Sequence, residues 1–313
     1  SSFDELAYTL TVPDPKRHLA PVRVEEAYGL DEEDLHAKTH IVMAWLLGKS
    51  ADLDTYLQAQ LLTAVLMDNA ASPLQQALET TSLGTSPSPL CGLEDSQKEL
   101  LFAAGIEGSD PEHTSQVEYL ILDVLKGIAE KGVPQESVEA CLHQLELQQR
   151  EIGGDGYPYG LQLILQGLNS ATHRGDPVAL LNLEPALEKL RQQASEPHFI
   201  QQLVQSLLLD NHHRVTLTLR PDNALNSRGD AAETAHLTAI RNALTEQDCQ
   251  HIIAQSLALQ ARQEAPVEDG ILPGVNLSDV PVTMQIPQPA SVVVSPIHLT
   301  RYQAGTNGLV YLQ

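Results

Sequence analysis

Aromatic side chains are scarce in this chain. Phe, Trp and Tyr make up 4% of its 313 residues, and Trp45 is the single tryptophan. Hydrophobic residues reach 42%, which is typical of a folded protein and not of a disordered one. The length suffices for one large or two ordinary domains. Because aromatic residues are so few, the core must be mainly aliphatic, which favours helices packed on a sheet.

Basic residues are also few. The chain has 18 Lys and Arg against 41 Asp and Glu, a formal net charge of −23. This balance argues against a nucleic-acid partner, because binding to phosphates needs a basic face. An acidic surface attracts cationic substrates. An adaptation for solubility or salt would give the same composition, so the charge by itself leaves both interpretations open.

Cysteine is rare as well. Cys91, Cys141 and Cys249 are odd in number and far apart, so no disulfide framework or CxxC metal site is indicated. This favours a reducing compartment such as the cytoplasm, or the mitochondrial matrix in a eukaryote. No apolar run approaches the length of about 18 residues that a membrane span needs, and we expect no membrane partner.

The first hundred residues predict one buried strand and two helices. The nearly continuous apolar run 39–48, THIVMAWLLG, has the length of a buried strand. Asp52 is placed to begin a helix that ends near Met67, and Ser72-Pro73 begins a shorter helix that ends near residue 83. Between the proline-containing start of the chain and the buried strand, residues 25–38 are predicted to form a charged connector.

The stretch 100–161 is the most regular part of the sequence. The apolar run 100–108 predicts a strand, and Asp110-Pro111 then predicts a helix N-terminus. Gly132 ends this first helix and Pro134 opens a second one. Apolar residues recur at helical spacing in both: Val117, Leu120, Ile121, Val124, Leu125 and Ile128, then Val138, Cys141, Leu142 and Leu145.

Downstream, the pattern changes twice. Residues 161–174 and 183–209 predict helices, and the strictly alternating 214–220 predicts a half-buried strand. Residues 223–264 are polar and rich in Ala and Gln, and Thr245 begins a new helix within them, so we expect two antiparallel helices. Beyond an irregular stretch, strands are predicted at 292–294 and 309–312.

Several of these segments resemble one known family. The run VEACLHQLELQQREIGGDGYPYGL (138–161) and the segment SPLQQALETTSLG (72–84) are similar to the pitrilysin-type, or inverzincin, zinc metallopeptidases, in the presequence protease and falcilysin branch. Pro221-Asp222 after a strand, the sequence LSDVP (277–281) and Thr306-Asn307-Gly308 also resemble that branch. The resemblance covers most of the chain.

The resemblance implies an α+β fold with a mostly antiparallel sheet, helices packed on one face, and a helical hairpin after it. It divides the chain into a non-catalytic peptidase-like domain (1–222), a helical hairpin and linker (223–281) and the first strands of another domain (282–313). The family's zinc motif, HxxEH, occurs at none of the 12 histidines. We therefore assign no catalytic residue and no cofactor to this chain, and the resemblance implies zinc in a catalytic domain upstream in the same polypeptide.

The function implied is that of a non-catalytic section of a zinc-dependent peptidase that degrades short unstructured peptides. This section would form chamber wall and hinge, with that catalytic domain and the peptides as its partners. The alternative is a zinc-free scaffold subunit of the same fold. An HxxEH in upstream sequence would favour the peptidase, so whether the parent protein is an enzyme is left open here.

Four residues are candidates for lining the substrate chamber: Arg150, Glu151, Tyr157 and Tyr159. The competing interpretation is that they only cap a helix and fix a turn. For a metal, the candidates are His36 and His40, because histidines four residues apart lie on one face of a helix. His40 opens the apolar run of a strand, however, so we expect that helical register to fail.

Overall fold

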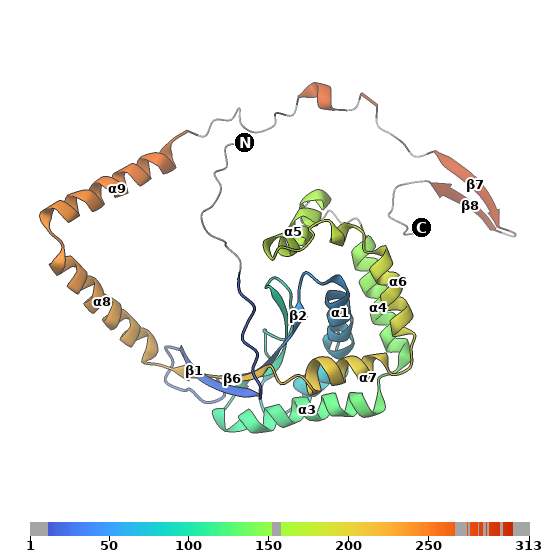
Figure 1. Cartoon of the computed structure of the whole chain (residues 1–313), viewed down its shortest axis with the longest axis horizontal. Helices are drawn as coiled ribbons and strands as arrows, with labels where there is room; N and C mark the ends of the chain where they lie inside the picture. Colours follow the sequence, from blue (N-terminus) through green and yellow to red (C-terminus); the bar gives the residue numbers. More distant parts are fainter. Residues whose placement is uncertain are drawn as a thin grey trace. The chain divides into compact units, whose positions relative to one another are not determined.

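The computed structural model describes residues 12–151 and 158–266, and beyond them residues 274, 276–280, 282–283, 286, 288–294 and 297–302. The chain divides into two units, with the first ending at Leu225 and the second running from Asn226 to Gly305 (Figure 1). No described helix is both long enough and apolar enough to cross a membrane.

Unit 1 is built on a six-stranded sheet. Its strands are β1 (Val22–Gly29), β2 (Thr39–Lys49), β3 (Ser86–Pro87), β4 (Gly92–Glu94), β5 (Glu99–Ser109) and β6 (Arg214–Asp222). The spatial order is β1-β6-β2-β5-β3, with β4 also paired to β5. Only β1 and β6 run parallel, so the mostly antiparallel sheet predicted from the resemblance is confirmed.

Helices cover the sheet and close the core. They are α1 (Leu53–Met67), α2 (Pro73–Thr80), α3 (Thr114–Lys131), α4 (Gln135–Arg150), α5 (Tyr159–Thr172), α6 (Glu184–Ala194) and α7 (Phe199–Leu203), which continues into a π-helical turn, Val204–Leu209. Ile41, Met43 and Trp45 alternate along β2 and pack into the same buried cluster as Leu61 of α1 and Ile121 of α3. The α+β fold and the aliphatic core are both confirmed.

Local sequence rules explain several boundaries. The side chain of Asp52 accepts the backbone N–H of Thr55 at 2.8 Å and begins α1 as expected. Gly132 ends α3 with φ of 75°, a left-handed conformation that glycine adopts without strain. Asp110 behaves differently from its prediction: it makes no side-chain cap bond. Its carboxylate instead accepts the N–H of Ala37 at 2.9 Å.

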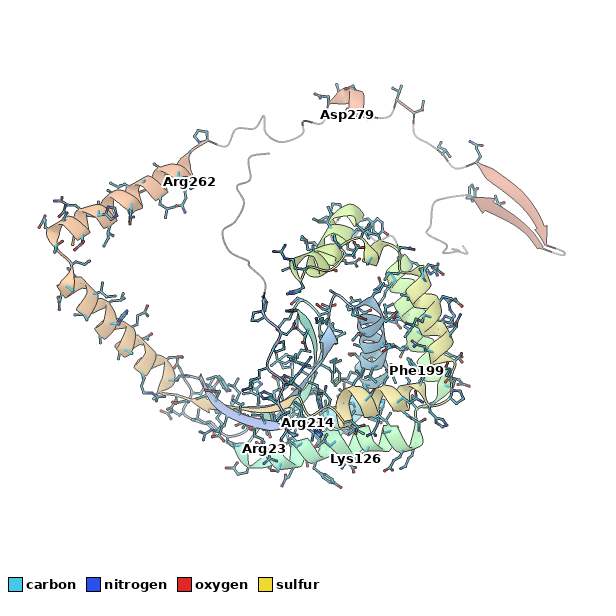
Figure 2. The ribbon with its side chains drawn as sticks, viewed as in Figure 1. Arg23, Lys126, Phe199, Arg214, Arg262 and Asp279 are labelled. Carbon is cyan, nitrogen blue, oxygen red and sulfur yellow. The ribbon has the colours of Figure 1, made fainter. Side chains whose placement is uncertain are left out.

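The prediction that residues 25–38 form a connector is wrong over its first part. Residues 25–29 belong to β1, which pairs in parallel with β6. β1 is an edge strand with no buried residue, and half of its residues are exposed, so its sequence lacks the apolar run that marks β2 and β5. Arg23 of β1 donates to Glu118 of α3 at 3.0 Å, and Arg214, also labelled in Figure 2, lowers the pKa of the same carboxyl.

The described residues of unit 2 include two long helices and a small hairpin of strands. The helices are α8 (Leu225–Ala243) and α9 (Glu246–Glu264), and the strands β7 (Pro289–Val294) and β8 (Ile297–Tyr302) pair antiparallel. Neither helix has a buried residue, and side chains such as Arg262 project into solvent (Figure 2). The two helices and the strand at 292–294 are confirmed, whereas packing of one helix against the other stays a prediction. The strand expected at 309–312 lies outside the described residues.

Candidate functional site

Two adjoining cavities in unit 1 form its candidate functional site. The first, of about 320 Å³, lies between the β2–α1 turn, helix α5 and the end of α4. The second, of about 420 Å³, lies between α1, strand β4 and α4. Asp95, in the turn between β4 and β5, lines both cavities, so the two meet at this residue beside α1.

Tyr56 of α1 stands at the junction of the two cavities. The side-chain amide of Gln60 donates to its hydroxyl oxygen at 2.7 Å. Burial raises the pKa of Tyr56, and the nearby carboxylate of Asp95, which also hydrogen-bonds to it, raises the pKa further. The phenol therefore keeps its proton through the physiological range and fixes Asp95 as an acceptor at the shared wall.

The lining of the cavities is rich in amides, hydroxyls and acids. Among the described residues that line them, three are charged, Asp68, Asp95 and Asp176, and none is Lys, Arg or His. Gln60 Oε1 and Thr63 Oγ1, in the second cavity, are buried atoms without a hydrogen-bond partner. Such a surface accepts hydrogen bonds and favours ligands that are cationic or rich in donors.

The predicted chamber residues lie near the first cavity. Arg150 ends α4 directly after Gln149, which lines that cavity, and its guanidinium pairs with Glu184 of α6 at 2.5 Å. Glu151 follows as an exposed residue whose N–H donates to the carbonyl of Leu147. Tyr159 begins α5 and is half-buried. Tyr157 lies outside the described residues.

These contacts show local structural roles for two of the candidates. The Arg150 ion pair joins α4 to α6, and the Glu151 N–H closes the last turn of α4. The Glu151 bond is of the kind expected from the capping interpretation, whereas the Arg150 ion pair connects two helices. Whether Arg150, Glu151 or Tyr159 also contacts a peptide stays a prediction.

The histidines proposed for a metal do not share a helix. His36 lies in the loop before β2 and faces Asp110 at 3.0 Å, whereas His40 is in β2, 3.7 Å from Glu107 and edge-on to the ring of Tyr28. The helical register that would join them is thus not formed. In the part of the chain that the structure describes, no three His, Cys, Asp or Glu side chains are gathered as metal donors. The described residues therefore do not fit a zinc site.

Sequence reasoning missed the residues that shape the cavities. Tyr56, Gln60 and Asp95 occur in no motif, and they come together only because α1 packs beside the turn after β4. A short polar stretch between two apolar strands, as around Asp95, looks like any solvated turn. The sequence signal was that some lining residues, such as Gln75, Gln144 and Gln149, fall in the two segments that resemble the peptidases.

Comparisons with known proteins agree with the geometry. The family model described as "Peptidase M16 inactive domain" matches residues 6–145, and a second model, for the segment associated with subfamily C of the M16 peptidases, matches residues 219–313. The presequence protease of Xenopus laevis mitochondria is 28% identical over 100% of this chain. Presequence protease 1 of Arabidopsis thaliana chloroplasts and mitochondria is 30% identical over 94% of it.

This chain spans 30% and 28% of the length of those two relatives. A solved peptidase M16 inactive domain from Pseudomonas fluorescens is 12% identical, with a TM-score of 0.46 over 68% of this chain and 46% of that one. At that distance the likeness adds no argument to the family match. The two models cover separate parts of the chain and describe parts of one family. The chain therefore belongs to the M16 peptidase family, and it contains an M16 inactive domain followed by the segment associated with subfamily C of that family.

Proposed function

We propose that this chain is a non-catalytic section of a zinc-dependent peptidase that degrades short unstructured peptides. The observation that carries the proposal is the match of residues 6–145 to an M16 inactive domain, in a chain aligned over nearly its whole length with presequence proteases. Zinc and the residues that bind it would then be supplied by a catalytic domain of the same polypeptide.

Within such an enzyme, unit 1 would form chamber wall. The two cavities beside α1 supply a concave surface that combines apolar side chains with amides, hydroxyls and carboxylates. Such a surface can hold an extended peptide, whose backbone needs hydrogen-bond partners wherever it leaves water. Helices α8 and α9 would form the hinge. Their described side chains are not buried, which leaves the segment free to move with the parts that it joins.

The charge of the wall favours basic peptides. Asp68, Asp95 and Asp176 line the cavities without a basic residue among the described lining, and the whole chain carries −23. A cationic side chain would be attracted at long range and held by acceptors at short range. Salt screens such attraction over about 10 Å at 0.1 M.

Two measurements test the central proposal. The purified 313-residue chain should contain no stoichiometric zinc after dialysis, and it should not cleave a fluorogenic unstructured peptide. The longer protein that contains it should cleave that peptide and lose the activity on chelation. One zinc per chain together with cleavage by the chain alone would overturn the proposal. A longer protein without metal-dependent cleavage would instead support the zinc-free scaffold.

A third measurement tests the preference for basic peptides in the longer protein. Cleavage of a basic peptide should weaken more steeply with added salt than cleavage of an acidic peptide of the same length. Asp95→Asn should reduce this difference, because it removes one charge from the shared wall while keeping the hydrogen-bonding shape. Equal salt dependence for both peptides would refute the charge argument and leave the peptidase role untouched.

The cysteines support a reducing compartment for this function. Cys91, Cys141 and Cys249 are all free thiols. Burial raises the pKa of Cys91 and of Cys141, so both resist oxidation better than an exposed thiolate would.

A further inference from the structure

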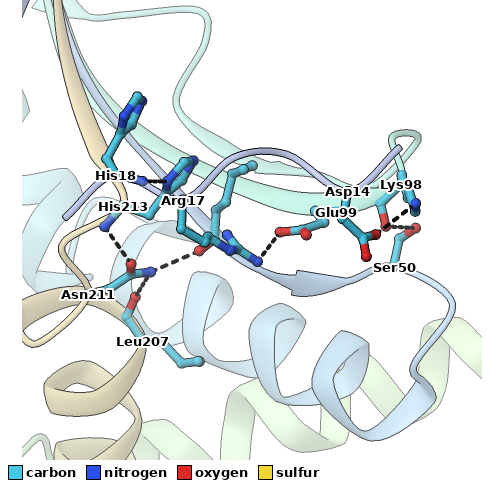
Figure 3. A network of polar contacts seen from close by, with 10 residues as sticks. Asp14, Arg17, His18, Ser50, Lys98, Glu99, Leu207, Asn211 and His213 are labelled. Atoms are coloured by element: carbon cyan, nitrogen blue, oxygen red, sulfur yellow. Dashed lines mark hydrogen bonds and ion pairs between the residues drawn. The ribbon is translucent and has the colours of Figure 1, made fainter. Parts of the chain in front are cut away.

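Residues 12–20 form an extended segment, here called the strap, that lies along the end of the sheet in unit 1 (Figure 3). All of its side chains are exposed, and Leu19 is 93% exposed, so burial of apolar surface does not hold it. Polar contacts attach it to the rest of unit 1 instead. Lys98 donates to the carbonyl of Val12 at 2.6 Å and pairs with Asp14 at 2.7 Å.

Two further contacts fix the middle of the strap. The guanidinium of Arg17 pairs with the buried carboxylate of Glu99 at 2.5 Å. The backbone N–H of His18 donates to Nδ1 of His213 at 2.8 Å. The rings of these two histidines are also stacked, with centroids 4.6 Å apart and planes inclined by 12°.

His213 is firmly held by the domain. Its N–H donates to Oδ1 of Asn211 at 3.0 Å, and the amide of Asn211 donates to the carbonyls of Leu46 and Leu207 at 2.8 and 2.9 Å. Asn211 thus ties the residue before β6 to β2 and to the π-helical turn (Figure 3). The backbone of His213 is therefore tied to the domain, and the strap is the part that can leave.

The bond between the strap and His213 requires a neutral imidazole. Nδ1 accepts a proton from a backbone N–H only while it carries none of its own, so the ring proton must be on Nε2. Protonation converts Nδ1 into a donor that faces another donor. The protonated ring of His213 is also positive and lies near Arg17, so the contact becomes repulsive.

We propose that His18 and His213 form a pH-operated latch, which holds the strap on the domain at neutral pH and releases it in mild acid. The latch fixes the direction in which the chain enters β1, because only Pro21 separates the strap from Val22, the first residue of that strand. Unlike the peptidase role, it rests only on contacts within unit 1. One role can therefore fail without the other.

The charged neighbours set the direction of the effect. Burial, His18 and Arg17 all lower the pKa of His213, and Glu99 opposes them. His212 and Arg214 are its neighbours in sequence. A histidine with a lowered pKa stabilises the attached state fully above its ordinary value of about 6.5, and this contribution is lost as the pH falls through the lowered value.

Amide hydrogen exchange of the full 313-residue chain tests the latch. After correction for intrinsic rates, the His18 amide should be protected at pH 7.5 and lose protection by about tenfold in acid, since one hydrogen bond is lost. The midpoint of this loss should coincide with the titration midpoint of the His213 ring, followed by NMR. Constant protection across the range, or two different midpoints, would overturn the proposal.

A matched variant separates the latch from general loosening in acid. In His213→Asn, the side-chain oxygen takes the place of Nδ1 but does not titrate, so the protection should be the same at both pH values. If the variant loses protection in acid as the wild type does, the latch is wrong. If the His18 amide is unprotected in the Asn variant even at pH 7.5, the variant does not test the latch. The wild-type protein then decides: the latch stands if loss of His18 protection and titration of the His213 ring have the same midpoint, and it fails if they differ.

Discussion

Helices α1 and α9 differ in what surrounds them. Both begin with a side-chain cap, from Asp52 and Thr245. Six residues of α1 are buried in the core of unit 1: Leu57, Ala59, Leu61, Leu62, Val65 and Leu66. No residue of α9 is buried, although its exposed side chains include large apolar ones, Ile252, Ile253, Leu257 and Leu259.

This difference shows two ways of stabilising a helix. Most of the stability of a helix such as α1 comes from packing of its apolar side, which ties it to the unfolding of the whole domain. A helix such as α9 depends on its cap, its residue propensities and its length of 19 residues, all of which act locally. The same substitution should therefore have different effects in the two places.

The largest difference is expected for leucine to alanine. Leu61 in α1 is fully buried, so Leu61→Ala should lower the free energy of unfolding of unit 1 by about 2–5 kcal/mol. Trp45, the single tryptophan, is buried in that unit, so its fluorescence during denaturant unfolding reports unit 1 specifically.

The matched control is Leu257→Ala in α9. Leu257 is 61% exposed, and its loss should change the same transition by less than about 0.5 kcal/mol. Equal effects at the two positions would mean that α9 is buried against unit 1 in solution. The comparison of the two helices would then be wrong.

A smaller loss is expected for Trp45→Phe. Its indole N–H donates to the carbonyl of Leu208 at 3.0 Å, and the ring is fully buried against Phe102. Phenylalanine keeps the aromatic packing but leaves that carbonyl without its donor, a loss of about 1–3 kcal/mol. Because the variant lacks tryptophan, its unfolding is followed by far-UV circular dichroism. An unchanged midpoint would show that another donor reaches Leu208.

The same contrast explains how much the sequence could predict. The strands β2 and β5 were recognised because their apolar runs are long and buried, and α9 because Thr245 and Asp248 form a capping box, which is a local pattern. β1 was not recognised as a strand. It is an exposed edge strand, and its partner β6 lies about 190 residues further on.

The candidate site was largely beyond sequence reasoning for the same reason. The resemblance pointed to the end of α4, but the cavities beside it are lined by Gln, Ser and Asp side chains from α1, α5 and the turn after β4. The positions of these residues in the sequence form no regular spacing that could be recognised as a motif. Only the packing of elements far apart in the chain brings Tyr56 to Asp95, or His18 to His213.

Removal of the cap of α9 tests the local argument directly. Thr245→Ala deletes the hydroxyl that accepts the N–H of Asp248 at 3.2 Å, which should destabilise α9 by about 1 kcal/mol. The helical signal in far-UV circular dichroism should fall. The denaturant midpoint of unit 1, followed by Trp45 fluorescence, should not change. Thr238→Ala, in the exposed interior of α8, is the control and should increase helicity, since alanine is the better helix former there.

Hydrogen bonds from Thr245 lower the pKa of Asp248, so the cap is also predicted to resist acid. Its contribution should be complete above the ordinary value of about 3.9 and be lost only as the pH falls through the lowered value. The helicity difference between wild type and Thr245→Ala should therefore be the same at pH 5 and pH 7. If the helicity difference vanishes at pH 5, the stability of the cap depends on a titrating group other than Asp248.

The smallest effects on stability are expected for alanine to glycine, and they should have opposite signs in the two units. Ala37 has a φ of 55°, held by its N–H bond to Asp110, and a side chain is strained in that left-handed conformation. Ala37→Gly should therefore stabilise unit 1 by about 0.5–1 kcal/mol. The unfolding transition followed by Trp45 fluorescence should then occur at a higher denaturant concentration. Ala254→Gly, in the middle of α9, should instead cost about 1 kcal/mol of helix stability and reduce helicity without moving that transition. If both substitutions destabilise, the turn at Ala37 relaxes in solution, and strain there is not what distinguishes the two positions.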